Sequence, residues 1–196
     1  MDSDKRMKQR FWLMQLLGIV MFIVGVMACY GGARGGAPWM GPLVVSIIVG
    51  VDFALSAKNR VAKAKLLAAV ILLGFLAESA LITLSLYTPS PASRWVMPVP
   101  LSPLWILALW LNFGTRIPSY LLFLRGRHLI NATIGFVFAF LIFRSAARMG
   151  VLELHHGLLG FTGIAVVWAI LVPVLYQLGA HWLMPANIQK ESGGEA

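Results

Sequence analysis

The chain is built from apolar runs of about 20 residues, and the length of these runs restricts its fold more than any other feature. A helix of about 20 residues crosses the ~30 Å hydrocarbon core of a bilayer. The whole chain has 196 residues, of which 59% are hydrophobic, and its mean hydropathy is +0.82. Because its apolar residues form continuous blocks rather than short alternating patterns, we expect an all-α polytopic membrane protein.

Six of these runs are long enough to be assigned as transmembrane helices. They cover residues 11–30, 38–55, 66–87, 103–124, 129–149 and 158–184. The spans leave only short tails and connections, so we expect residues 1–196 to form a single integral membrane domain. The connection after Tyr87 is rich in proline and is not expected to be helical.

The distribution of basic residues predicts how these six spans are oriented. Six spans place both termini on the same side, and the segments on that side contain eleven lysines and arginines, against three on the other. Cytoplasmic segments carry this excess, so we expect both termini inside (N-in/C-in). The basic clusters are expected to contact anionic lipid headgroups on the cytoplasmic side. The net charge of +9 does not indicate nucleic-acid binding, because the charges lie beside the spans.

The first span has an alternative interpretation as a lipoprotein signal peptide. It follows a basic tail and ends in Val26-Met27-Ala28-Cys29, where Cys29 would be acylated. The apolar core is longer than a typical signal core, and Met27 is unusual at its position. These departures favour a retained first helix.

Ionisable residues inside the apolar runs are the candidate functional groups. Glu78, Arg116 and Arg144 each lie within a predicted span, where a charge is costly unless it is paired or hydrated. The helical rise places Glu78 at a depth between those of the two arginines, and Asp52 within reach of Arg116. Asn112 shares a helix face with Arg116. We therefore expect these five residues to line one polar site.

Three interpretations of this polar site remain open. The charges can be ion pairs that fix helix packing. They can also neutralise the head of an amphipathic ligand. In the third interpretation Glu78 is a catalytic acid or base.

Other polar residues give weaker signals. Glu153, His155 and His156 lie in one predicted loop and are weak candidates for a metal site. His128 and His181 lie near the inner face and are weak candidates for the two axial ligands of a haem. Adjacent histidines chelate poorly on a helix, and interfacial histidines commonly contact headgroups. We therefore expect no metal and no cofactor.

One part of the sequence resembles a known family. The residues that carry the resemblance are Pro103–Trp110, Phe113, Leu122–Arg127, Ala147–Gly150 and Glu153-Leu154. From about Glu78 to Leu154 the chain resembles a small bacterial inner-membrane family, domain of unknown function 2878. The resemblance implies a multi-pass protein of the inner membrane and supplies no activity.

These patterns favour a non-enzymatic membrane protein. The leading hypothesis is a small-ligand or lipid-binding subunit associated with transport, served by other membrane subunits. One alternative is a structural or assembly subunit of a larger membrane complex. The other is a lipid- or isoprenoid-modifying enzyme that uses Glu78. No GxSxG, HExxH or P-loop motif supports the enzyme.

Overall fold

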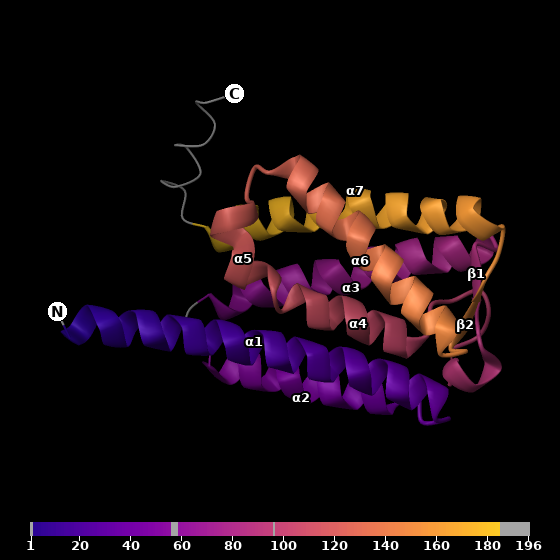
Figure 1. Cartoon of the computed structure of the whole chain (residues 1–196), viewed down its shortest axis with the longest axis horizontal. Coiled ribbons are helices and arrows are strands. Elements are labelled where there is room, and N and C mark those ends of the chain that lie inside the picture. Colours follow the sequence, from indigo (N-terminus) through magenta and orange to yellow (C-terminus); the bar gives the residue numbers. More distant parts are fainter. Residues whose placement is uncertain (1, 56–58, 96, 185–196) are drawn as a thin grey trace.

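The computed structural model describes residues 2–55, 59–95 and 97–184, and this part of the chain is almost entirely helical (Figure 1). Its α-helices are α1 (Asp2–Arg34), α2 (Met40–Leu55), α3 (Arg60–Thr83), α4 (Leu104–Gly114), α5 (Ile117–Leu124), α6 (His128–Arg148) and α7 (Gly157–Leu183). Between α3 and α4 lie the strand β1 (Tyr87–Pro89) and the 3-10 helix η1 (Pro91–Ser93), and β2 (Leu152–Leu154) precedes α7.

The predicted membrane character is confirmed by the length and composition of four helices. α3, α6, α7 and the part of α1 from Trp12 to Arg34 are long and apolar enough to cross a membrane. Large apolar side chains also cover the outside of the bundle, and Leu129 and Leu159 are each 84% exposed. Such a surface suits lipid rather than water. The chain is therefore a multi-pass helical membrane protein.

Most predicted spans correspond to one helix with shifted ends. α1 begins at Asp2, well before residue 11, and α3 ends at Thr83, so Tyr87 lies in a strand instead of a span. α2 has 16 residues and α4 has 11, both short of a full crossing.

The predicted span 103–124 is not one regular helix, because the chain breaks into α4 and α5 at Thr115 and Arg116. The break lies just before Pro118, a residue that is expected to kink a helix in this span. The Thr115 hydroxyl donates to the carbonyl of Asn112 at 2.7 Å, which draws the last turn of α4 away from regular geometry. Pro118 lies in the first turn of α5, where its missing N–H costs nothing. The break places the side chain of Arg116 at the junction of two helices.

A small antiparallel sheet joins the connections that precede α4 and α7, and the all-α prediction did not include it. β1 pairs with β2, with Tyr87 opposite Leu154, and the Thr88 hydroxyl is 2.8 Å from His155 Nε2. We call these two strands the β-clasp. Strands of three residues are too short to show a period-2 pattern in the sequence.

Successive passes of the chain run in opposite directions along the bundle. The start of α1 and the end of α7 lie at the same end, and the β-clasp lies at the opposite end (Figure 1). α6 packs mainly against α7, and α1 packs against α2 and α4.

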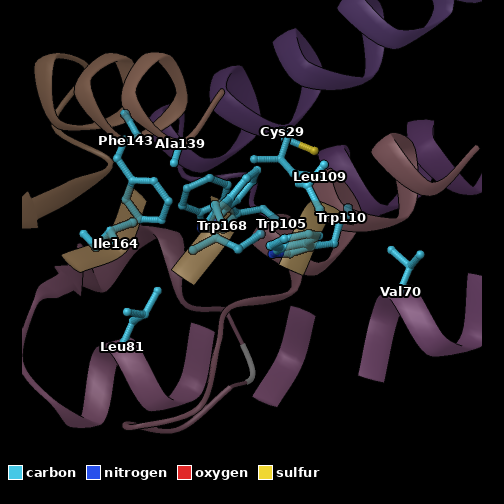
Figure 2. Packing of buried hydrophobic residues seen from close by; sticks show 14 of the residues in the cluster. Cys29, Val70, Leu81, Trp105, Leu109, Trp110, Ala139, Phe143, Ile164 and Trp168 are labelled. Carbon is cyan, nitrogen blue, oxygen red and sulfur yellow. The ribbon is translucent and has the colours of Figure 1, made fainter. Parts of the chain in front are cut away.

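The core is centred on three tryptophans. Trp105, Trp110 and Trp168 gather between α1, α3 and α6, and each is at most 3% exposed (Figure 2). Cys29 is also fully buried, and its backbone and sulfur pack against Gly41 on α2. This burial favours a packed first helix over the lipoprotein interpretation.

Candidate functional site

Glu78 lies in the core and accepts hydrogen bonds from three uncharged side chains. One carboxylate oxygen, Oε1, accepts from the indole nitrogens of Trp110 and Trp168, each at 3.0 Å. The other, Oε2, accepts from the Tyr87 hydroxyl at 2.8 Å. Glu78 is 0% exposed. We call Glu78, Tyr87, Trp110 and Trp168 the Glu78 cluster; its members come from α3, β1, α4 and α7.

Aromatic rings enclose this carboxylate. The rings of Trp110 and Trp168 lie 4.2 Å apart between centroids, and Phe143 makes edge contacts with both Trp168 and Tyr87. Burial, followed by the charge of Glu78 and the hydrogen bond to it, raises the pKa of Tyr87 well above its ordinary value. Tyr87 therefore remains protonated and keeps its O–H as a donor.

Glu78 contacts neither Arg116 nor Arg144, the two arginines whose predicted depths lie on either side of its own. Helical rise gave the depth of each residue but not the direction in which its side chain leaves the helix. The phenol and the two indoles supply donors to a buried carboxylate without placing a second charge in the core. The Glu78 cluster is thus well suited to hold four elements together.

Arg116 instead pairs with Asp52, as the sequence suggested for these two residues. The distance from Arg116 Nη2 to Asp52 Oδ1 is 3.7 Å, and Arg116 Nε donates to the Thr115 hydroxyl at 3.0 Å. The other Asp52 oxygen forms an ion pair with Lys63 on α3. We call Arg116, Asp52 and Lys63 the Arg116 cluster. All three side chains are largely shielded, with 14%, 18% and 7% exposure respectively.

Asn112 lies one turn before Arg116 and contacts α1. Its amide nitrogen donates to the carbonyl of Phe22 at 2.9 Å, while its Oδ1 is buried with no hydrogen-bond partner in the described part of the chain. Gly25 on α1 leaves the space that Asn112 fills, and Gly18 does the same for Arg116. These glycines are seven residues apart and share one face of α1. This face is therefore occupied within the chain.

Arg144 does not join either cluster, and its side chain is exposed on α6. The buried face of α6 is marked by Ala139, Phe143 and Ala146. Arg144 follows Phe143 by one residue, so it is rotated by about 100° from the core. A single site containing all five predicted residues is thus not formed.

Two cavities meet at Arg116. The first has a volume of about 390 Å³ and is almost wholly apolar; its lining residues include Phe22, Phe113 and Phe138. The second, of about 150 Å³, is lined by polar groups that include Asp52, Gln15 and Ser119. Arg116 lines both cavities, whereas Glu78 lines neither. The apolar cavity lies among α1, α4, α5, α6 and α7.

Sequence reasoning missed Lys63 and the three donors of Glu78. Lys63 was assigned to a cytoplasmic connection, but it lies in the first turn of α3 and turns toward Asp52. Trp110 and Trp168 were unremarkable in apolar runs. A buried tryptophan usually finds a partner for its indole N–H, and that tendency was the available signal. Trp105 departs from it, because its indole nitrogen is buried with no hydrogen-bond partner among the residues that the structure describes.

The fold and these two clusters define a multi-pass helical membrane protein with a buried carboxylate and, apart from it, an arginine that lines two cavities. The chain belongs to a family of proteins of unknown function, DUF2878, which matches residues 11–174. This confirms the family resemblance and extends it beyond Glu78–Leu154. No curated protein and no solved structure matches the chain.

Proposed function

We propose that this protein binds an amphipathic anionic ligand, with its head at Arg116 and its chain in the apolar cavity. The observation that carries the proposal is the position of Arg116 at the junction of an apolar and a polar cavity. Ligand sites combine a mainly apolar wall with a few polar groups that orient the ligand. A guanidinium, held by Thr115 and next to Gln15 and Ser119, fits the head of a lipid-like anion.

An intramembrane arginine without a ligand would be costly, and Asp52 offsets that cost only in part. Their 3.7 Å separation exceeds hydrogen-bonding distance, and Asp52 is shared with Lys63. This arrangement supports a site that retains attraction for another anion. It favours a binding or transport-associated subunit over a chain whose charges serve packing alone.

The Glu78 cluster offers less support for an enzyme. Both oxygens of Glu78 already accept hydrogen bonds, and neither cavity reaches it. A general acid or base must lie within hydrogen-bonding reach of its substrate. We therefore assign Glu78 to packing and Arg116 to binding.

We also propose a six-pass topology in the bacterial inner membrane with both termini in the cytoplasm. The broken pair α4–α5 would complete one pass and α2 another. Support comes from the alternating helix directions and from the basic residues that gather at the end where α1 starts. At that end Arg60, Lys65 and Trp182 line a hollow of about 450 Å³, which suits contact with anionic headgroups.

Native mass spectrometry of protein purified gently from its membranes tests the binding proposal. We expect a retained lipid-like anion on the unmodified protein and its loss from Arg116→Gln, because the guanidinium supplies the charge that holds the head. Arg144→Gln is the matched control: it removes the same charge from an exposed position on α6.

Equal retention by Arg116→Gln and Arg144→Gln would overturn the binding site. If the unmodified protein carries protein subunits and no small molecule, the structural-subunit alternative replaces this proposal.

A further inference from the structure

We infer that Asp52 acts as an internal counter-ion that sets the charge of the preferred ligand head at minus one. This inference rests on the proposed function and narrows the ligand to a single-chain amphiphile with a monoanionic head. Three observations carry it: the charge balance of the Arg116 cluster, the geometry around Asp52 and the size of the apolar cavity.

The charge balance of the cluster is plus one. Arg116 and Lys63 are cationic and Asp52 is anionic, so the three residues together carry a net charge of plus one. Arg116 and Asp52 are the charged residues that line the two cavities. In a shielded site a monoanionic head would complete neutrality, whereas a dianion would leave an excess negative charge beside Asp52.

The geometry allows Arg116 to exchange partners. Asp52 is bonded more closely to Lys63 than to Arg116, through a different carboxylate oxygen. Arg116 Nε is fixed by Thr115, so the terminal nitrogens of the guanidinium are the groups that meet an incoming head. An anion can therefore occupy Arg116 while Asp52 keeps Lys63.

The apolar cavity suits one chain. Its volume of about 390 Å³ is near the lower end of the ~300–1,000 Å³ typical of small-ligand sites. The walls are aromatic and aliphatic side chains with Arg116 at one side. One aliphatic or prenyl chain is the matching occupant, rather than the two chains of a bilayer phospholipid.

Three probes with the same chain and different heads test the charge rule. Hexadecyl sulfate carries one negative charge, hexadecyl phosphate carries nearly two above its second pKa of about 6, and hexadecanol carries none. Binding is measured at pH 8.5 by native mass spectrometry from nanodiscs of neutral lipid. We expect the unmodified protein to prefer the sulfate by roughly ten-fold over the phosphate, and not to retain the alcohol.

Asp52→Asn should reverse this order, since it raises the cluster charge to plus two. The double variant Asp52→Asn/Lys63→Met returns the charge to plus one and should recover the preference for sulfate. Asp52→Glu keeps the charge and is the matched control. Because the double variant balances the charge, the test does not depend on the stability of Asp52→Asn alone.

The outcomes separate this inference from the proposed function. If the unmodified protein retains none of the three probes, the binding site itself is overturned. If it binds sulfate and phosphate equally, or if the order is the same in all four proteins, binding stands and the role of Asp52 is overturned.

Discussion

At the scale of single residues, Glu78 and Arg116 show two ways of keeping an ionisable group in an apolar bundle. Glu78 is enclosed by neutral donors that satisfy both carboxylate oxygens. Arg116 shares its partner Asp52 with Lys63, and it lines the apolar cavity. The first arrangement fixes the structure, because losing the acceptor strands three buried donors. The second leaves attraction for a ligand.

Glu78→Ala should destabilise the protein strongly. It leaves the Tyr87 hydroxyl and two indole N–H groups buried without an acceptor, and each unsatisfied group costs about 1–3 kcal/mol. Glu78→Gln keeps one carbonyl oxygen and should be milder. Thermal unfolding in detergent, followed by tryptophan fluorescence, measures both.

The matched control is Glu153→Ala, which removes an exposed carboxylate from β2. Equal stability of the Glu78→Ala and Glu153→Ala variants would contradict the packing role assigned to Glu78.

The sequence identified the buried ionisable residues, but it did not identify most of their partners. Glu78, Arg116 and Asp52 were selected because charges in apolar runs are costly, and the Arg116–Asp52 pair was expected. The expectation that Glu78 shares a site with Arg116 and Arg144 was wrong, because neutral aromatic donors, two of them distant in sequence, satisfy its carboxylate. Arg144 was misplaced because its position relative to Phe143, and not its depth, decides which way it faces.

At the scale of elements, the break between α4 and α5 and the glycine face of α1 shape the site together. The break brings Arg116 to a junction where two cavities meet. Gly18 and Gly25 let α1 approach the polar side of α4 closely enough for Phe22 to accept from Asn112. Sequence periodicity located the long helices, but it placed α4 and α5 in one span with a kink at Pro118, because apolar residues continue through both.

Gly25→Ala should lower stability even though alanine is the better helix former. An added Cβ would lie 2.5 Å from Asn112 Nδ2, and Asn112 is short and anchored, so α1 and α4 must separate. Gly18 is less informative, because its neighbour is the far end of a flexible arginine.

Gly50→Ala on α2 is the matched control, since no atom lies within 4 Å of its added Cβ. It should keep or raise stability, as removing a helical glycine gains about 1 kcal/mol. The melting temperatures of the Gly25→Ala and Gly50→Ala variants are measured side by side. Equal melting temperatures would contradict close packing of α1 on α4.

At the scale of the whole molecule, the two ends of the bundle differ in composition. The β-clasp and the proline-rich connection lie at one end, while most basic residues gather at the other. Membrane character was predictable from apolar run length alone. The clasp was not, because three-residue strands depend on tertiary contact rather than on a sequence pattern.

The proposed topology predicts opposite accessibility of the two ends. In a Cys29→Ser background, Ala92→Cys near the clasp should react with a membrane-impermeant maleimide in intact cells. Arg127→Cys at the other end should react only after permeabilisation. If only Arg127→Cys reacts in intact cells, the orientation is the reverse of the proposed one. If both cysteines react in intact cells, the two positions lie on the same side, and α4–α5 does not cross the membrane once between them.

The β-clasp has a mechanical consequence for the cavities. It ties the chain after α3 to the chain before α7, and Glu78 and Tyr87 lie close to the same end. Arg116 and both cavities lie further along the bundle, beside α5, which has only eight residues. The helices are thus tied together at the end of the bundle that carries the β-clasp. Any widening that admits a ligand should pivot about the clasp, so that the largest displacement falls on the helix ends beside Arg116.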